Sequence, residues 1–238
     1  MSNAQTFLAL FNKIEQFLDK LNNSTEHHGF RRLVDDLSKH NSLVANYKLE
    51  LVDYLELRNA IVHKSTDMPI AEPYPEIIKK MQRIYDDLSN PPKAINIAAK
   101  PVYTCTTETP ILEIIKEMNQ NFYTSIPIYH QDQFIGVFSD NSLTRWLAHT
   151  NKPLNLKNIL VSQVQDYFDK ADNKFNSYKF MNIETDVFTI KRAFTSFTEE
   201  KMRLGAIFLT QNGQKNEKIL GIITAWDLPK INQPINHE

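Results

Sequence analysis

Apolar side chains recur every three or four positions through most of residues 1–92, which is the spacing of one buried helix face. The first such stripe begins at Phe7 and ends at Leu21. Further stripes predict helices over residues 30–40, 42–64 and 76–90, and a proline pair at 91–92 ends the pattern. The spacing therefore predicts an all-α bundle of four helices over residues 1–92.

The pattern changes after the proline pair, where short runs of β-branched and aromatic residues alternate with helical stripes. The predicted order over residues 95–150 is strand, helix, strand, strand, helix. The same order recurs over residues 158–232, where QNGQ is a turn signal within the second hairpin. These two segments form an internal repeat, so the predicted fold class is α+β, with a helical bundle followed by two βαββα units.

Two octets mark the same place in each repeat. GVFSDNSL (residues 136–143) and GIITAWDL (residues 221–228) share a glycine, two apolar residues, a hydroxyl and a closing leucine. In the second octet, Thr224 ends a predicted strand and Asp227 falls in the first turn of the next helix. A hydroxyl at a helix N-terminus can donate to a phosphate, and a carboxylate one turn later can accept from ribose hydroxyls. The same spacing is also an ordinary helix N-cap arrangement, and the two roles are compatible.

With their upstream hairpins, the octets resemble a tandem pair of cystathionine β-synthase-type (CBS) domains, the arrangement called a Bateman module, over residues 95–232. The resemblance implies two repeats packed as a pseudo-two-fold pair. It also implies an adenine nucleotide such as AMP or ATP as a regulatory ligand in the cleft, without a metal. In the first repeat, Ser142 replaces the carboxylate, so we expect that cleft to be empty or to hold a different ligand.

The resemblance assigns the remaining ligand contacts around the second octet. Gly205 and Ala206 are small and would let the base approach the backbone, and Lys179 and Phe180 would close the pocket. Two basic residues are candidate phosphate partners. The full expected set is Thr224, Asp227, Gly205, Ala206, Lys179, Phe180, Arg203 and Lys230.

The segment LRNAIVHK (residues 57–64) resembles the Arg-Asn-x-x-x-His signature of HEPN domains, which are usually dimeric helical bundles and in some cases metal-independent ribonucleases. In that interpretation His63 is an acid or base and Arg58 holds a phosphate. In the alternative interpretation Asn59 and His63 form hydrogen bonds within the bundle and Arg58 pairs with an acid. Residues 1–92 contain 11 Lys plus Arg and 13 Asp plus Glu, a balance that disfavours RNA.

Composition narrows the class of protein. The length of 238 residues suits two domains, and the net charge of -1 does not indicate a general nucleic-acid binder. The single cysteine, Cys105, excludes an internal disulfide, and no apolar run approaches the roughly 18 to 20 residues that span a bilayer. The N-terminus predicts an amphipathic helix rather than a signal peptide, so we expect a cytoplasmic protein without a membrane partner. Cys105, Trp146 and Trp226 are predicted to be packing residues.

The sequence thus predicts a homodimeric regulatory protein that senses an adenine-type ligand. Two alternatives stay open. One is a ribonuclease gated by the CBS ligand, with Arg58, Asn59 and His63 as its site and RNA as its substrate. The other is a structural dimerisation protein with vestigial clefts.

Overall fold

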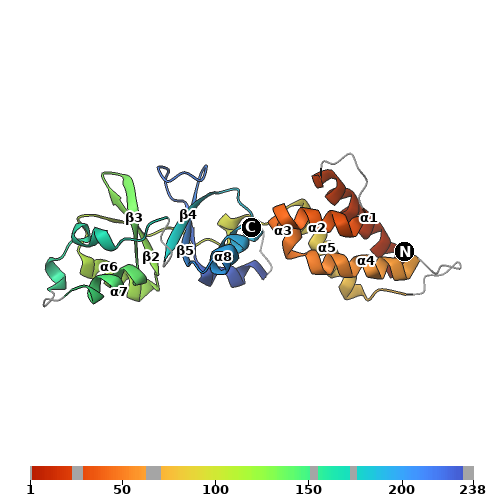
Figure 1. The fold of residues 1–238 in the computed structure, drawn as a ribbon, viewed down its shortest axis with the longest axis horizontal. Coiled ribbons are helices and arrows are strands. Elements are labelled where there is room, and N and C mark those ends of the chain that lie inside the picture. The colour runs from red at the N-terminus through yellow and green to blue at the C-terminus, as the bar shows by residue number, and fades with distance from the viewer. Residues whose placement is uncertain (1, 23–28, 63–70, 151–154, 172–175, 233–238) are drawn as a thin grey trace. The chain divides into compact units, whose positions relative to one another are not determined.

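A computed structural model describes residues 2–22, 29–62, 71–150, 155–171 and 176–232. The chain divides into two compact units, Met1–Pro92 and Lys93–Glu238, and each is described by itself (Figure 1). His63, one of the candidate residues of the HEPN-like segment, lies outside the described residues.

The first unit is helical, as predicted. Its helices are α1 (Asn3–Asn22), α2 (Phe30–His40), α3 (Ser42–Asn46), α4 (Lys48–Val62) and α5 (Pro75–Ser89). Most of the predicted apolar stripe of α1 is buried: Phe7, Phe11, Ile14 and Leu18 are at most 1% exposed, whereas Leu21 at its end is 39% exposed. The prediction of one continuous helix over residues 42–64 is wrong, because the chain turns at Tyr47. The Tyr47 hydroxyl donates to the Asp87 carboxylate of α5, and this bond between helices holds the turn in place.

The second unit has the predicted order of elements twice. The first repeat comprises β1 (Cys105–Thr106), α6 (Ile111–Asn121), β2 (Ser125–His130), β3 (Gln133–Ser139) and α7 (Asp140–Ala148). The second repeat comprises β4 (Ser177–Asn182), α8 (Val187–Glu199), β5 (Leu204–Thr210), β6 (Gly221–Ile223) and the 3-10 helix η4 (Ala225–Asn232). Three further 3-10 helices, η1 (Ala94–Asn96), η2 (Leu156–Asn158) and η3 (Val161–Tyr167), precede the repeats. The mixed α+β class is therefore confirmed.

Each repeat has its own three-stranded sheet, ordered β1-β2-β3 in the first repeat and β4-β5-β6 in the second. Within each sheet the first two strands are parallel and the hairpin strands are antiparallel. A helix separates the parallel strands, as a parallel connection requires. In each repeat, the octet begins in the last strand of the hairpin and continues past the end of that strand.

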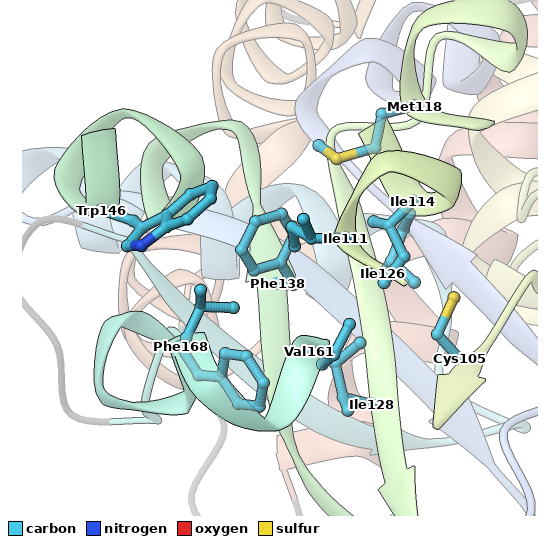
Figure 2. Close-up of a cluster of buried hydrophobic side chains, with 11 residues drawn as sticks. Cys105, Ile111, Ile114, Met118, Ile126, Ile128, Phe138, Trp146, Val161 and Phe168 are labelled. Carbon is cyan, nitrogen blue, oxygen red and sulfur yellow. The ribbon is translucent and has the colours of Figure 1, made fainter. Parts of the chain in front are cut away.

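The core of the first repeat lies between its sheet and its helices (Figure 2). Cys105 and Trp146 are buried there, which confirms their predicted packing role. Three members of this core, Val161, Val164 and Phe168, come from the segment that leads into the second repeat. The corresponding prediction for Trp226 is wrong, because its side chain is 81% exposed. Its helix η4 is short and contains Pro229, and it leaves the indole outside the core.

The segment before each repeat pairs with the last strand of the other repeat. Ala99 forms an antiparallel bridge with Ile222 of β6, and Asp169 forms the equivalent bridge with Val137 of β3. Ile222 and Val137 are the second residues of the two octets. Each octet therefore lies against backbone that is remote in sequence, and this pairing determines what surrounds it.

Candidate ligand-binding site

A cavity of about 710 Å³ lies beside the second octet. One wall comes from the second repeat and includes Ile222, Thr224 and Asp227. The other walls come from the first repeat, namely the segment that precedes β1 and the turn between α6 and β2. The lining residues of these walls are Ala99, Pro101, Val102, Tyr103, Met118, Asn119, Asn121, Phe122, Tyr123, Thr124 and Ser125. A cavity of this size is in the range that holds a nucleoside-sized ligand.

Asp227 is held by three hydrogen bonds at the edge of this cavity. Its Oδ2 accepts from the N–H of Thr224 at 2.8 Å and from the Thr224 hydroxyl at 3.1 Å. Its Oδ1 accepts from the Lys230 ammonium at 2.6 Å. A carboxylate offers about four acceptor positions, so one position on Oδ1 is left for a ligand hydroxyl. The helix-cap and ligand-contact interpretations of the octet thus coexist in the same side chain.

Lys230 has a structural role in this arrangement. Besides Asp227, its ammonium donates to the carbonyl of Ile97 at 3.3 Å, which ties η4 to the segment that precedes β1. Lys230 itself is not among the lining residues of the cavity. Asp227 is the only charged residue among the described residues that line it.

Two exposed aromatic side chains border the cavity from opposite repeats. Trp226 lies between Thr224 and Asp227 in sequence, and Phe122 follows α6 in a left-handed backbone conformation, with φ of 58°. Their side chains are 81% and 88% exposed. The sequence analysis missed both residues as site residues. The signal for Trp226 was its place between the two polar residues of the octet, on a segment too short to bury an indole.

The other expected ligand contacts lie elsewhere. Ala206 is buried in a core between the two sheets, and Phe180 packs against the same core. The Lys179 ammonium lies 4.6 Å from the ring centre of Phe197, on α8. Arg203 lies 3.9 Å from the Asp140 carboxylate, next to the first octet. None of these residues lines the cavity at the second octet.

Gly205 also belongs beside the first octet. A Cβ at this position would lie 2.5 Å from Oδ1 of Asn176, so an alanine there would collide with that amide. The sequence analysis expects the small residue to admit a ligand base. In the structure a side chain of the same chain occupies the space instead.

Among the residues that the structure describes, a buried polar cluster surrounds the first octet. Ser139 Oγ accepts from the N–H of Ser142 at 3.1 Å and from Nδ2 of Asn176 at 3.2 Å. The same Asn176 nitrogen donates to Asp169 Oδ2 at 2.5 Å, and Arg145 donates to Asp169 Oδ1 at 3.1 Å. Ser139, Ser142, Asp169 and Asn176 are each at most 2% exposed. A second cavity, of about 550 Å³, touches Asp169, but neither octet serine lines it.

Burial raises the pKa of the Asp169 carboxyl above its ordinary value, because removal from water disfavours the charged form. Hydrogen bonds from Ser139 and Asn176 and the charge of Arg145 act in the opposite direction. Desolvation is the larger effect. The buried carboxyl group of Asp169, which lies outside the octet in sequence, thus sits beside the first octet.

The candidate residues of the first unit form no assembled site among the residues that the structure describes. Arg58 Nη1 donates to Oδ1 of its neighbour Asn59 at 3.4 Å. Glu56, an acid that the sequence suggests as a partner for Arg58, instead pairs with Arg31 at 2.6 Å. The position of His63 relative to these residues lies outside the described part of the chain.

A family model matches part of the chain. Residues 94–149, which include the first repeat, match the model described as CBS domain. No curated protein matches the chain in sequence. Within the described ranges, no helix is long and apolar enough to cross a membrane, and no group of three His, Cys, Asp or Glu side chains is placed to hold a metal ion.

Several solved CBS structures are similar to part of this chain. The CBS domain of a CBS domain-containing membrane protein from Sphaerobacter thermophilus is 16% identical, with a TM-score of 0.44, and the match covers 65% of this chain and 97% of that one. The CBS domain pair of protein MJ0100, in complex with 5'-methylthioadenosine and S-adenosyl-L-methionine, is 13% identical, with a TM-score of 0.43 over 59% and 95% of the chains. A hexameric CBS-CP12 protein from bloom-forming cyanobacteria is 16% identical, with a TM-score of 0.41 over 60% and 73%. Each of these structures is under 25% identical to the chain and has a TM-score below 0.5.

Proposed function

We propose that this chain is a regulatory protein in which two CBS repeats, packed as a pseudo-two-fold pair, sense an adenosine-containing ligand such as AMP. The observation that carries the proposal is the cavity beside the second octet, where Thr224 and Asp227 face residues of the first repeat. A ligand bound there contacts both repeats at once. Its binding therefore favours one arrangement of the pair over others, which is how a small molecule transmits a signal.

The ribose would lie against Asp227. The free acceptor position on Oδ1 can take a ribose hydroxyl without breaking the bonds from Thr224 or Lys230. A hydrogen bond to a charged acceptor contributes about 1.5 to 3 kcal/mol. Asp227 is thus the main polar contact in the proposed site.

The base would lie between apolar walls. Val102 and Ile222 line the cavity, and Trp226 and Phe122 border it from opposite repeats with most of their rings exposed. Stacking of a base on an aromatic side chain is worth about 1 to 3 kcal/mol. A ligand that covers Trp226 also removes apolar surface from water.

The phosphate would have only neutral donors. No Lys or Arg lines the cavity among the described residues, and Lys230 is already bound to Asp227 and to the Ile97 carbonyl. Backbone N–H groups at the start of η4 can hold one phosphate group. The lining therefore favours AMP, or an uncharged adenosine derivative, over ATP.

Titration calorimetry with AMP, adenosine, 5'-methylthioadenosine and ATP tests this function. We expect saturable binding of at least one of the first three, and weaker binding of CMP as a matched pyrimidine control. The absence of binding by any adenosine compound at millimolar concentration, with a folded protein, would refute the proposal.

The helical first unit would serve as an assembly module, and we propose that the chain is a homodimer. Light scattering at micromolar concentration tests the assembly, and a stable monomer mass contradicts it. Incubation with total RNA tests the alternative activity. Metal-free cleavage that His63→Ala abolishes would favour a ribonuclease over a non-catalytic module.

A further inference from the structure

The two octets have equivalent surroundings down to individual hydrogen bonds. The segment before each repeat bridges the second residue of the opposite octet, through Ala99 in one case and Asp169 in the other. Lys230 lies two positions after the second octet and donates to the carbonyl of Ile97, two residues before Ala99. Arg145 lies two positions after the first octet and donates to the carbonyl of Tyr167, two residues before Asp169. Ala99 and Asp169 are therefore equivalent positions, and so are Lys230 and Arg145.

The two clefts differ at these equivalent positions. Beside the second octet, Ala99 has no polar side chain and lines the open cavity. Beside the first octet, Asp169 places a carboxylate at the same point, and Arg145 binds it at 3.1 Å. The carboxylate of the second octet comes from within the octet, as Asp227, and binds Lys230 at 2.6 Å. Each basic residue thus binds one carboxylate. In the second cleft the carboxylate belongs to the octet, and in the first it belongs to the segment that pairs with the octet.

Asn176 fills the rest of the first cleft. Its amide lies against the α-carbon of Gly205, where a Cβ would approach three of its atoms at 2.5 to 2.9 Å. It also joins Ser139 to Asp169 through a single nitrogen. The Asn176 side chain thus fills the space that a ligand would need between the first octet and β5.

We infer that Asp169 and Asn176 form an internal plug that takes the place of a ligand in the first cleft, so that the chain binds one adenosine-type ligand and not two. This inference rests on the proposed function for its ligand. In this inference, Asp169 and Asn176 prevent ligand binding in the first cleft and leave only the second cleft open to a ligand.

An exchange of the equivalent residues tests the plug, with AMP and 5'-methylthioadenosine as probes in titration calorimetry. The wild type should bind one equivalent, and Asp227→Ala should weaken that binding roughly 10- to 100-fold. The double variant Asp169→Ala/Asn176→Ala removes both members of the plug, and Ser142→Asp added to it supplies the carboxylate of the second octet. We expect a second equivalent to bind to this triple variant. Two equivalents on the wild type, or one on the folded triple variant, would overturn the inference while leaving the proposed function intact.

The reciprocal variant Ala99→Asp guards against a triple variant that fails to fold. It places a carboxylate in the open cavity, at the position that Asp169 occupies in the other cleft. We expect the affinity for either probe to fall at least tenfold with an unchanged melting temperature. Unchanged affinity would overturn the inference.

If neither probe binds, the proposed function fails, but the plug can still be tested by a stability measurement without ligand. Gly205→Ala should lower the urea midpoint in the wild-type background, because the new methyl group collides with the Asn176 amide. The same substitution should leave the midpoint unchanged in an Asn176→Ala background. Equal losses in both backgrounds would show that Asn176 does not fill the cleft.

Discussion

The two octets are a comparison within one chain, because the same strand-to-helix turn has two different surroundings. At the second octet, Thr224 and Asp227 line a cavity of about 710 Å³. At the first, Ser139 and Ser142 are fully buried beneath a carboxylate from another part of the chain. The backbone pairing is equivalent in both places, so the backbone does not decide whether a cleft is open. Side chains at a few equivalent positions do.

The first octet differs from the second in the buried polar cluster beside it. Burial of a cluster with an internal charge pair costs desolvation, and its hydrogen bonds offset this cost only in part, because Asn176 Oδ1 and Arg145 Nε have no hydrogen-bond partner among the described residues. Asp169 accepts from Asn176 and Arg145, and its N–H donates to the carbonyl of Val137 at 2.8 Å. The first cleft thereby gains a rigid connection between the repeats where the second keeps a space.

The largest expected contrast concerns the two tryptophans of the closing helices. Trp146 is buried in the first-repeat core, so Trp146→Ala should lower the free energy of unfolding by about 3 to 5 kcal/mol. Trp226 is 81% exposed, so Trp226→Ala should change that free energy by no more than about 0.5 kcal/mol. It should instead weaken AMP binding roughly 5- to 100-fold through lost stacking.

Chemical denaturation and calorimetry on the two variants check this contrast, with Trp226→Phe as the control that keeps an aromatic ring. Trp226→Phe should retain most of the affinity. A large loss of stability in Trp226→Ala would mean that the indole is a packing residue after all.

The second contrast concerns the matched positions Asp227 and Ser142. Asp227→Ala should weaken AMP binding roughly 10- to 100-fold, because it removes a charged acceptor worth about 1.5 to 3 kcal/mol. Ser142→Ala removes a buried hydroxyl and should cost about 1 kcal/mol of stability without changing affinity. Calorimetry with AMP and with its 2'-deoxy analogue checks both. Equal affinities for wild type and Asp227→Ala would leave Asp227 with only its helix-cap role.

Much of this contrast follows from local sequence, and part of it does not. The helical stripes, the two hairpins and the repeated octet are local patterns, and the structure confirms the elements that they predict. The absence of a carboxylate at Ser142 is also visible in the sequence. The turn at Tyr47 was missed because the apolar stripe continues through it, and its contact with Asp87 on a different helix has no local signal.

The site itself depends on contacts between segments that are distant in the sequence. Gly205 was expected to admit a ligand base beside the second octet, but the pairing of strands places it beside the first, against Asn176. Nothing local indicates that Asp169 lies beside Ser142, where the first octet lacks a carboxylate, because this contact depends on the pairing with Val137. Sequence could name the polar residues of the octets but not their neighbours.

A third contrast concerns charge. No Lys or Arg lines the open cavity in the described part of the chain, so ATP should bind no more tightly than AMP, and AMP affinity should change little with salt. Asn119 lines the same cavity, and Asn119→Lys adds a cation there. That variant should raise AMP affinity roughly two- to fivefold, a gain of about 1 kcal/mol or less, and should make it salt-dependent. Tighter binding of ATP than of AMP by the wild type would contradict the neutral lining.

The smallest expected effect is the pH dependence that the plug adds to stability. Burial raises the pKa of Asp169, so the folded chain holds this proton to a higher pH than the unfolded chain does. Between the ordinary pKa of an aspartate and the raised value, folding takes up a proton, and the free energy of unfolding falls as the pH rises. Asp169→Asn cannot titrate. Its stability should therefore improve relative to wild type across that window, as measured by urea denaturation at a series of pH values. A stability difference between the two proteins that is constant with pH, or that changes in the opposite direction, would contradict this prediction. It would mean that Arg145 and the hydrogen bonds of the cluster outweigh desolvation, so that the Asp169 pKa is not raised by folding.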